Sequence, residues 1–354
     1  MEFIDNQEAA DAILDKCLDK KKTRALYLDF EADNFHHYNE LLCTVQLCLN
    51  GNFYLLDAIN LDLKKKFAEV MAQQQLWLHG SDYDLYLLDR YLGIKPAHLN
   101  DTQVAARLCG FKKFGYASLV NQICGINLPK DSQRADWTKR PLPEKMIKYA
   151  ENDVRYLPQI SDILLMRLEK LGRMEWFKES CDALSQNVSY QGRASDRDAW
   201  RVNGSGHLGP SALRYLKALY EWRDDQAQKA DRPSFKVMNN QKLVDWAKAL
   251  DKEGSITPPK SMKAARKEAL LSSIEAAKEI SEELWPEKLV QPRKPRVKID
   301  EAALNALLDK RTKVGADLNI EPSLIASRKT LEAIVKDENE VQSLLKWQRE
   351  LLEL

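Results

Sequence analysis

Two acidic residues, Asp29 and Glu31, stand one residue apart in the segment "LYLDFEAD" at residues 26–33. The preceding apolar run predicts a buried strand that ends at these acids. Side chains alternate between the faces of a strand, so both carboxylates lie on one face while Leu28 and Phe30 lie on the other. Two acids on one face repel each other and lose hydration when covered, so they need water, cations or a metal ion. Taken alone, the pattern describes a solvated strand end better than a metal site.

Three more residues could extend this pair. Asp84 is the third residue of a helix predicted after the apolar segment "LWLHG", where the helix dipole favours a carboxylate in any case. Tyr149 and Asp153 lie four residues apart in "KYAENDVRYL", and therefore on one face of a later helix. In isolation these two residues are an ordinary surface pair. Whether all five residues form one site depends on the order of the motifs along the chain.

The elements that must position these residues predict a mixed α/β domain in the first 190 residues. Strands come early and helices alternate later, which favours a mixed sheet flanked by helices. Asn50 and Gly51 accept the positive φ values of a hairpin turn between two strands. Two helices are predicted at about residues 7–20 and 61–75, and a third from Ser81 or Asp82 to Gly93. A fourth helix follows a cap at Asp101 and Thr102. A fifth helix begins at Pro143 and is kinked or broken at Pro158.

Composition bounds the class of protein. The chain has 354 residues, 44% of them hydrophobic and 30% charged, which is typical of a soluble protein with two or three domains. No stretch approaches the roughly 18 apolar residues of a membrane span, and the charged N-terminal segment does not resemble a signal peptide. The six scattered cysteines fit reduced thiols and a cytoplasmic protein. A net charge of +1 neither requires nor excludes nucleic acid, although "QPRKPRVK" is locally basic.

The chain changes character after about residue 185. A polar, glycine-bearing segment indicates a domain boundary, and the sequence beyond it is almost wholly helical. We predict an α/β catalytic domain over residues 1–190 and two all-α blocks over residues 208–286 and 300–354. Aromatic and basic residues alternate in the first block (Trp222, Arg223, Arg232, Phe235, Lys236), which permits stacking and phosphate contacts. The alternative is that Trp222 and Trp246 are core residues and that the blocks brace the catalytic domain.

The motifs, taken together and in order, resemble the tyrosine subgroup of the DEDD exonucleases, which have a ribonuclease H-like fold. More closely, the chain resembles the ribonuclease D family. Five segments carry the resemblance: "LDFEAD", "LHGSDYDLYLL", "LNDTQVAARLCG", "DSQRADWTKRPL" and "YAENDVRYL". The helical blocks resemble HRDC domains, the first through "LKALYEWRDDQAQKADRPSFKVMNNQKLVDWA" and the second through "IEPSLIASRKTLEAI" and "LLKWQRELL".

The resemblance implies catalytic roles for Asp29, Glu31, Asp84, Tyr149 and Asp153. Asp84 is chosen over Asp82 because the family's aspartate directly precedes the apolar residue that is Leu85 here. Phosphodiester hydrolysis needs an activated water and a stabilised leaving oxygen, and two divalent ions roughly 4 Å apart meet both needs. Carboxylate ligands suit Mg²⁺ or Mn²⁺. By resemblance, Asp29 would bind both ions, Glu31 and Asp153 the ion beside the attacking water, and Asp84 the other ion mainly through water.

Tyr149 is expected to orient the attacking water, because its ordinary pKa of about 10 makes it a poor base at neutral pH. Other substrate contacts are weaker predictions. They include Phe30, where bacterial relatives often have threonine, and His79, for which a structural role is the stronger alternative. Trp137, Lys139 and Arg140 could contact RNA or pack before the helix that Pro143 opens.

The resemblance implies a 3′-to-5′ exoribonuclease that trims tRNA precursors and other structured RNA and releases nucleoside 5′-monophosphates. It also implies a monomer that does not bind a membrane. Two alternatives belong to other classes: a non-catalytic RNA-binding protein on a degenerate nuclease scaffold, and a DNA exonuclease. The presence of all five motif residues weighs against the first. Two HRDC-like blocks without a helicase or polymerase segment weigh against the second.

Overall fold

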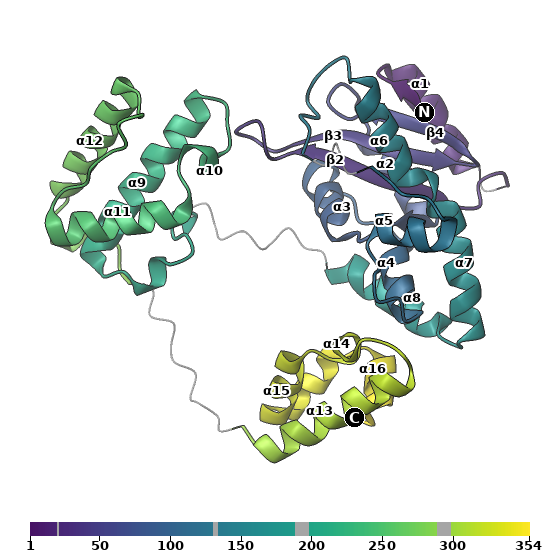
Figure 1. Cartoon of the computed structure of the whole chain (residues 1–354). Helices are drawn as coiled ribbons and strands as arrows, with labels where there is room; N and C mark the ends of the chain where they lie inside the picture. Colours follow the sequence, from purple (N-terminus) through teal and green to yellow (C-terminus); the bar gives the residue numbers. More distant parts are fainter. Residues whose placement is uncertain (20, 130–133, 188–197, 289–298) are drawn as a thin grey trace. The chain divides into compact units, whose positions relative to one another are not determined.

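The chain folds as two compact units in the computed structural model (Figure 1). The structure describes residues 1–354 except residues 20, 130–133, 188–197 and 289–298. The first unit comprises Met1–Ala32, Leu42–Tyr190 and Arg296–Leu354, and the second comprises Asp33–Leu41 and Gln191–Pro295. The basic segment "QPRKPRVK" and part of the predicted connector after residue 185 lie outside the described residues.

A six-stranded mixed sheet forms the centre of the first unit, with the strand order β1-β4-β3-β2-β5-β6. The pairs β1 with β4, β2 with β5, and β5 with β6 are parallel, whereas β3 and β4 are antiparallel. The mixed sheet predicted from the sequence is therefore confirmed. The strands are β1 (Glu2–Ile4), β2 (Leu26–Asp33), β3 (Leu41–Leu49), β4 (Asn52–Asp57), β5 (Leu76–Leu78) and β6 (Leu99–Asp101).

The hairpin between β3 and β4 has the turn that its sequence predicts. Asn50 and Gly51 have φ values of 50° and 80°, and Leu49 pairs with Asn52 across the turn. The two outermost strands, β1 and β6, were not predicted from the sequence. Each has only three residues, so neither is long enough to establish the period-two pattern by which strands are recognised.

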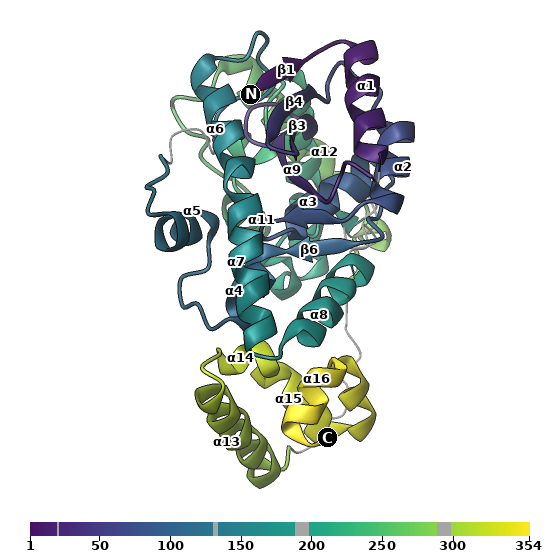
Figure 2. The same ribbon diagram turned by 90° about the vertical axis from the view of Figure 1, so that its right-hand side faces the viewer.

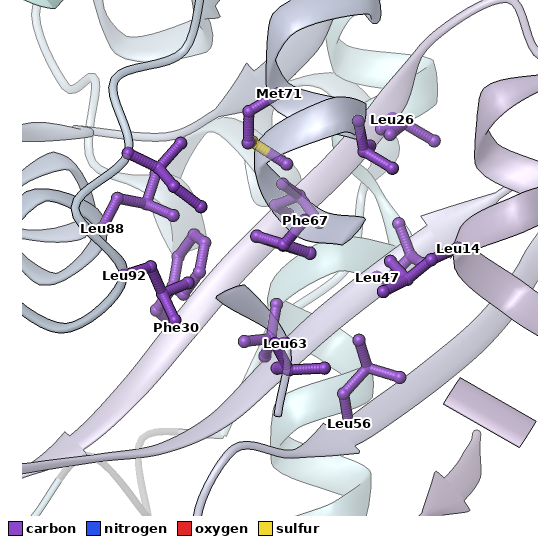
Figure 3. Packing of buried hydrophobic residues seen from close by; sticks show 14 of the residues in the cluster. Leu14, Leu26, Phe30, Leu47, Leu56, Leu63, Phe67, Met71, Leu88 and Leu92 are labelled. Atoms are coloured by element: carbon purple, nitrogen blue, oxygen red, sulfur yellow. The ribbon is translucent and has the colours of Figure 1, made fainter. Parts of the chain in front are cut away.

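Strand β2 presents its two faces as predicted, but it does not end at the acids. It continues to Asp33, so Asp29 and Glu31 lie inside the strand rather than at its edge. The neighbours of Leu28 and Phe30 are apolar, and the ring of Phe30 packs edge-on against Phe67 with the centroids 6.4 Å apart (Figure 3). The hydrophobic core behind the sheet therefore fixes which way the two carboxylates point.

Helices of the first unit place the other acids beside β2. The helix α3 begins at Asp82, which makes Asp84 its third residue as predicted. The predicted break near Pro158 is also confirmed, since α6 ends at Arg155 and α7 begins at Leu157. The remaining helices preceding residue 190 are α1 (Gln7–Leu18), α2 (Lys64–Gln73), η1 (Leu88–Leu92), α4 (Thr102–Leu108), α5 (Tyr116–Leu119), η2 (Val120–Cys124) and α8 (Met174–Asn187), and α3 and α6 span Asp82–Leu87 and Glu144–Arg155.

The C-terminal helices lie beside α7 and α8 of the nuclease part of this unit (Figure 2), and apolar side chains of both parts form one hydrophobic core. The ring of Trp347 stacks on Trp176 at 5.1 Å, and Trp347 also donates its ring N–H to Ser180. Arg173 is buried and donates to the carbonyl of Leu108 at 2.5 Å and to that of Leu318 at 2.7 Å. These helices are α13 (Glu301–Asp317), α14 (Pro322–Ile325), α15 (Arg328–Lys336), η6 (Glu338–Ser343) and α16 (Lys346–Leu352).

We expect Arg173→Ala to destabilise this unit by about 3 kcal/mol, because it leaves two carbonyls without their charged donor. The measurement is the free energy of unfolding in urea. Arg24→Ala is the matched control, since the Arg24 side chain is 85% exposed and its ion pair with Asp162 is long, at 3.7 Å. Equal unfolding free energies for the two variants would contradict a bracing role for Arg173.

The second unit has a helical core of its own, built mainly by α9, α11 and α12. Trp222 and Trp246 are both buried in this core, which confirms the alternative given for them. Arg223 is also buried, and it donates to the carbonyl of Met238 and to the side chain of Asn240. The prediction that Trp222 and Arg223 stack on or pair with RNA is therefore wrong. The helices are α9 (Pro210–Lys229), α10 (Ser234–Val237), α11 (Asn240–Glu253), α12 (Ala264–Lys278), η4 (Ser205–His207) and η5 (Glu282–Leu284).

The segment Asp33–Leu41 packs with these helices. Tyr38 donates its hydroxyl to Asp224 at 2.7 Å, and the rings of Phe35 and Phe235 meet edge-on at 5.5 Å. Among the described residues, no helix is both long enough and apolar enough to cross a membrane.

Candidate active site

A pocket of about 250 Å³ lies where β2, α3 and α6 meet in the first unit. The five residues for which the sequence predicts catalytic roles all line it, although they come from three distant parts of the chain. The lining residues are Leu28, Asp29, Phe30, Glu31, His79, Gly80, Tyr83, Asp84, Tyr116, Tyr149, Asp153 and Leu157. None of these described lining residues is lysine or arginine, so the pocket brings no side-chain cation to its four carboxylates.

Three of the carboxylates are close enough to share an ion. Asp29, Glu31 and Asp153 can each offer an oxygen such that all three atoms lie within 4.8 Å of one another. Asp84 is not in this group of three, but it lines the same pocket and its charge acts on Glu31. The strand places two of the acids, α6 places the third, and α3 places the fourth.

Burial raises the pKa of all four acids, and repulsion raises it further in Glu31, Asp84 and Asp153. Burial is the main cause in each case, and it raises the pKa of Asp29 to about 7 and that of Asp153 to about 9. The pKa values of Glu31 and Asp84 lie well above their ordinary range for the same reason, with a further contribution from the charge of Asp29. The site therefore holds protons that a cation would displace, and its hard oxygen donors fit Mg²⁺ or Mn²⁺.

Tyr149 is suited to donate a hydrogen bond rather than to accept a proton. Burial, followed by the charges of Asp153 and Glu31, raises its pKa above the ordinary value, so its hydroxyl stays protonated at every working pH. A side-chain hydrogen bond joins it to Asp153. The ring packs beside that of Trp137, with the centroids 6.1 Å apart.

The five weaker predictions occupy different places. Phe30 and His79 line the pocket, although the Phe30 side chain is only 5% exposed and belongs to the core. Trp137 is buried behind Tyr149, and Lys139 is exposed. Arg140 is bound to Asp57 through two hydrogen bonds, of 2.8 and 2.5 Å, and it also donates to the carbonyl of Trp137. Trp137 and Arg140 thus pack before α6, which was the alternative given for this segment.

Tyr116 also lines the pocket, although it was not predicted from the sequence. Its hydroxyl donates to the carbonyl of Asn152 at 2.8 Å and accepts from the N–H of Tyr156 at 3.3 Å. In an uninterrupted helix these two backbone groups would bind each other, so the hydroxyl is inserted into the ladder between α6 and α7. Asp153 is the next residue along α6. The only signal in the sequence was the helix break at Pro158, which does not say what fills the gap.

We expect Tyr116→Phe to reduce turnover about 10-fold and to weaken metal affinity, because it removes the bridge that fixes the helix turn beside Asp153. Turnover and the Mg²⁺ concentration for half-maximal activity are the two measurements. Tyr54→Phe is the control, since Tyr54 belongs to β4 and does not line the pocket. If both variants keep the Mg²⁺ requirement of the unchanged protein, Tyr116 does not position Asp153.

The comparisons with known proteins define the class first. Residues 1–169 match the family model described as 3′-5′ exonuclease, and residues 212–253 match that of the HRDC domain. The solved structure of RNase D from Escherichia coli, described as an exoribonuclease involved in structured RNA processing, has the same fold. It superposes with a TM-score of 0.72 at 24% identity, over 99% of this chain and 96% of that one.

Two curated relatives span almost the whole chain. A ribonuclease D of Pseudomonas paraeruginosa is 30% identical over 335 residues, which cover 92% of this chain and 87% of the relative. A ribonuclease D of Xanthomonas oryzae pv. oryzae is 28% identical over 344 residues, which cover 92% of this chain and 90% of the relative. The chain belongs to the ribonuclease D family. It is a 3′-to-5′ exoribonuclease, an enzyme that hydrolyses phosphodiester bonds at RNA ends.

Proposed function

We propose that this enzyme trims the 3′ ends of structured RNA, including tRNA precursors, and releases nucleoside 5′-monophosphates with the help of two divalent ions. The observation that carries the proposal is a set of four carboxylates, Asp84 buried and the other three half-buried, in a pocket whose described lining contains no lysine or arginine. Divalent ions would displace the protons that these acids hold and would supply the positive charge that an anionic substrate needs there. Mg²⁺ and Mn²⁺ both fit the oxygen donors.

Each acidic residue has a proposed share in holding the ions. Asp29 would hold both, Glu31 and Asp153 the one on the side of the attacking water, and Asp84 the other. Bound there, the ions would lower the pKa of water and stabilise the charge on the leaving oxygen. Tyr149, protonated and placed beside Asp153, would donate a hydrogen bond that orients the attacking water.

We further propose different tasks for the two helical blocks, residues 208–286 and 300–354, both taken as HRDC-like. The first would bind RNA through its exposed residues, which include Phe235 at 50% exposure. The second would brace the nuclease part, a role supported by the shared core and by the contacts of Arg173 and Trp347. We propose a monomer in the cytoplasm, where the six free cysteines would stay reduced.

The test compares tRNA with an extended 3′ end and single-stranded DNA as substrates, each with Mg²⁺, Mn²⁺ or EDTA. We expect shortening of the RNA one nucleotide at a time with either metal and no shortening in EDTA. No metal-dependent shortening of either substrate would indicate a non-catalytic binding protein. Faster shortening of the DNA would overturn the RNA substrate but not the nuclease activity.

A further inference from the structure

His79 lines the active-site pocket, with one ring nitrogen bound and the other buried without a hydrogen-bond partner among the described residues. It follows β5 directly and is a lining residue together with the four carboxylates. Its Nδ1 is 2.9 Å from the hydroxyl oxygen of Thr102. Its Nε2 is buried and has no hydrogen-bond partner in the described part of the chain. A buried acceptor of this kind costs about 1–3 kcal/mol unless something donates to it.

The bond at Nδ1 determines which nitrogen carries the proton. Thr102 is fully buried, and it donates its single hydroxyl proton to the carbonyl of Leu78 at 3.0 Å. The hydroxyl can therefore only accept from His79, so the ring proton lies on Nδ1. Burial lowers the pKa of His79 to about 4, which keeps the ring neutral. Nε2 is consequently a lone-pair acceptor at neutral pH.

The surrounding backbone holds this arrangement rigid. The carboxylate of Asp101 accepts from the N–H groups of Gly80 and Ser81, at 3.0 and 2.7 Å, immediately after His79. The same carboxylate accepts from the N–H of Gln103 at 2.7 Å and caps α4, whose first residue is Thr102. Asp101 thus holds the backbone next to His79 and next to Thr102, the residue that determines the tautomer of His79.

The chemistry of the pocket restricts the partner of Nε2. A phosphate at neutral pH has no proton to donate, and its charge belongs with the cations that the carboxylates attract. Base N–H groups differ from one nucleotide to the next. The sugar hydroxyls are donors that the terminal nucleotide carries whatever its base, and its sugar is bonded to the phosphate under attack. We propose that Nε2 of His79 accepts a hydrogen bond from a ribose hydroxyl of the 3′-terminal nucleotide.

This assignment rests on the proposed function, and it makes His79 a residue that distinguishes one sugar from another. If the donor is the 2′-hydroxyl, the bond discriminates RNA from DNA. If it is the 3′-hydroxyl, the bond instead recognises an unblocked end. Both hydroxyls present the same chemistry to Nε2, so substrates lacking one or the other separate them.

The experiment uses three oligonucleotides that differ only at the last residue, which is a ribonucleotide, a 2′-deoxynucleotide or a 3′-deoxynucleotide. The rate of the first cleavage in Mg²⁺ is measured under single-turnover conditions, because later cleavages meet ordinary ribose. The dissociation constant in Ca²⁺ is measured in parallel, so that the comparison does not depend on cleavage. We expect the unchanged protein to lose about 10-fold on one of the two deoxy substrates.

Two substitutions separate the free nitrogen from the bound one. His79→Asn keeps an amide N–H near the position of Nδ1, where it can donate to Thr102, but it removes Nε2. His79→Gln places an amide oxygen near the position of Nε2 and should restore part of the discrimination. The exposed His98 provides the control His98→Asn, which should behave as the unchanged protein.

We expect the unchanged protein to cleave and bind one deoxy substrate less well than the ribonucleotide substrate, and we expect His79→Asn to abolish this difference. The rate and affinity of His79→Asn for the other deoxy substrate, relative to the ribonucleotide substrate, should be those of the unchanged protein. An equal loss on all three substrates, or a changed Mg²⁺ requirement, would overturn the proposal in favour of a trapped water or a metal ligand. Equal binding of the three substrates by the unchanged protein would also overturn it. Binding discrimination without any cleavage would instead count against the proposed function alone.

Discussion

Asp29→Ala is expected to lose both metal binding and activity, whereas Tyr149→Phe keeps metal binding and loses only turnover. The charge of Asp29 acts on all three other acids, since it raises the pKa of Glu31, Asp84 and Asp153. Its removal takes away one of the three carboxylates that are close enough to share an ion. We expect a fall in activity of about three orders of magnitude for Asp29→Ala.

Tyr149→Phe removes a hydroxyl but no charge. The acid cluster stays intact, so metal affinity should change little, while the attacking water loses its orienting donor. We expect turnover to fall about 100-fold. Metal affinity is measured by titration calorimetry with Mg²⁺, and turnover by release of nucleotide. Equal metal affinity in the two variants would contradict this division of roles.

Asp82→Asn is the matched control for both substitutions. Asp82 is also on α3, two residues before Asp84, but it is exposed and does not line the pocket. Its substitution should leave both quantities unchanged. A large loss in Asp82→Asn would mean that the second acid of the site has been assigned to the wrong aspartate.

The second large effect is a loss of stability of the metal-free protein as the pH rises. Asp29 and Asp153 have pKa values of about 7 and 9 in the fold, above the ordinary aspartate value of 3.8. Between pH 4 and 9 the folded state therefore binds more protons than the unfolded state does. Stability is then fully present below about pH 4 and is lost as the pH rises through the folded pKa values. For Asp29 alone the loss is on the order of 4 kcal/mol by pH 8.

The measurement is the melting temperature from pH 5 to pH 9 in EDTA and in Mg²⁺. We expect the EDTA curve to fall and the Mg²⁺ curve to stay flatter, because the ion replaces the protons that leave. Asp29→Asn should flatten the EDTA curve, since it removes a buried charge, and Asp82→Asn should not. A melting temperature in EDTA that rises over this range would show that the acids are stabilised as carboxylates without metal.

Local backbone geometry made part of the acidic site predictable from the sequence. The period of two along β2 placed Asp29 and Glu31 on one face, and the period of the helix placed Tyr149 with Asp153, because both rules depend only on local backbone geometry. The hairpin at Asn50 and Gly51 and the helix break near Pro158 were predictable for the same reason. That the motifs come together was inferred from the family resemblance and not from any local rule.

Other features could not be predicted from the sequence because they depend on contacts between distant residues. The short strands β1 and β6 exist through pairing with β4 and β5, and three residues carry too little pattern to reveal it. Trp222 and Arg223 looked like contacts for RNA because an aromatic residue beside a basic one is ambiguous. The carbonyl of Met238 and the side chain of Asn240 accept hydrogen bonds from the buried Arg223, and neither partner can be identified from the local sequence.

By itself the sequence determined the chemistry available to this protein: four carboxylates, a tyrosine, and the elements that carry them. The tertiary structure decided what each group can do, because burial, charge and hydrogen bonding depend on neighbours distant in sequence. It brought three carboxylates within 4.8 Å of one another and inserted the hydroxyl of Tyr116 between α6 and α7. It also bound one nitrogen of His79 to Thr102, 23 residues away, and left the other as an acceptor.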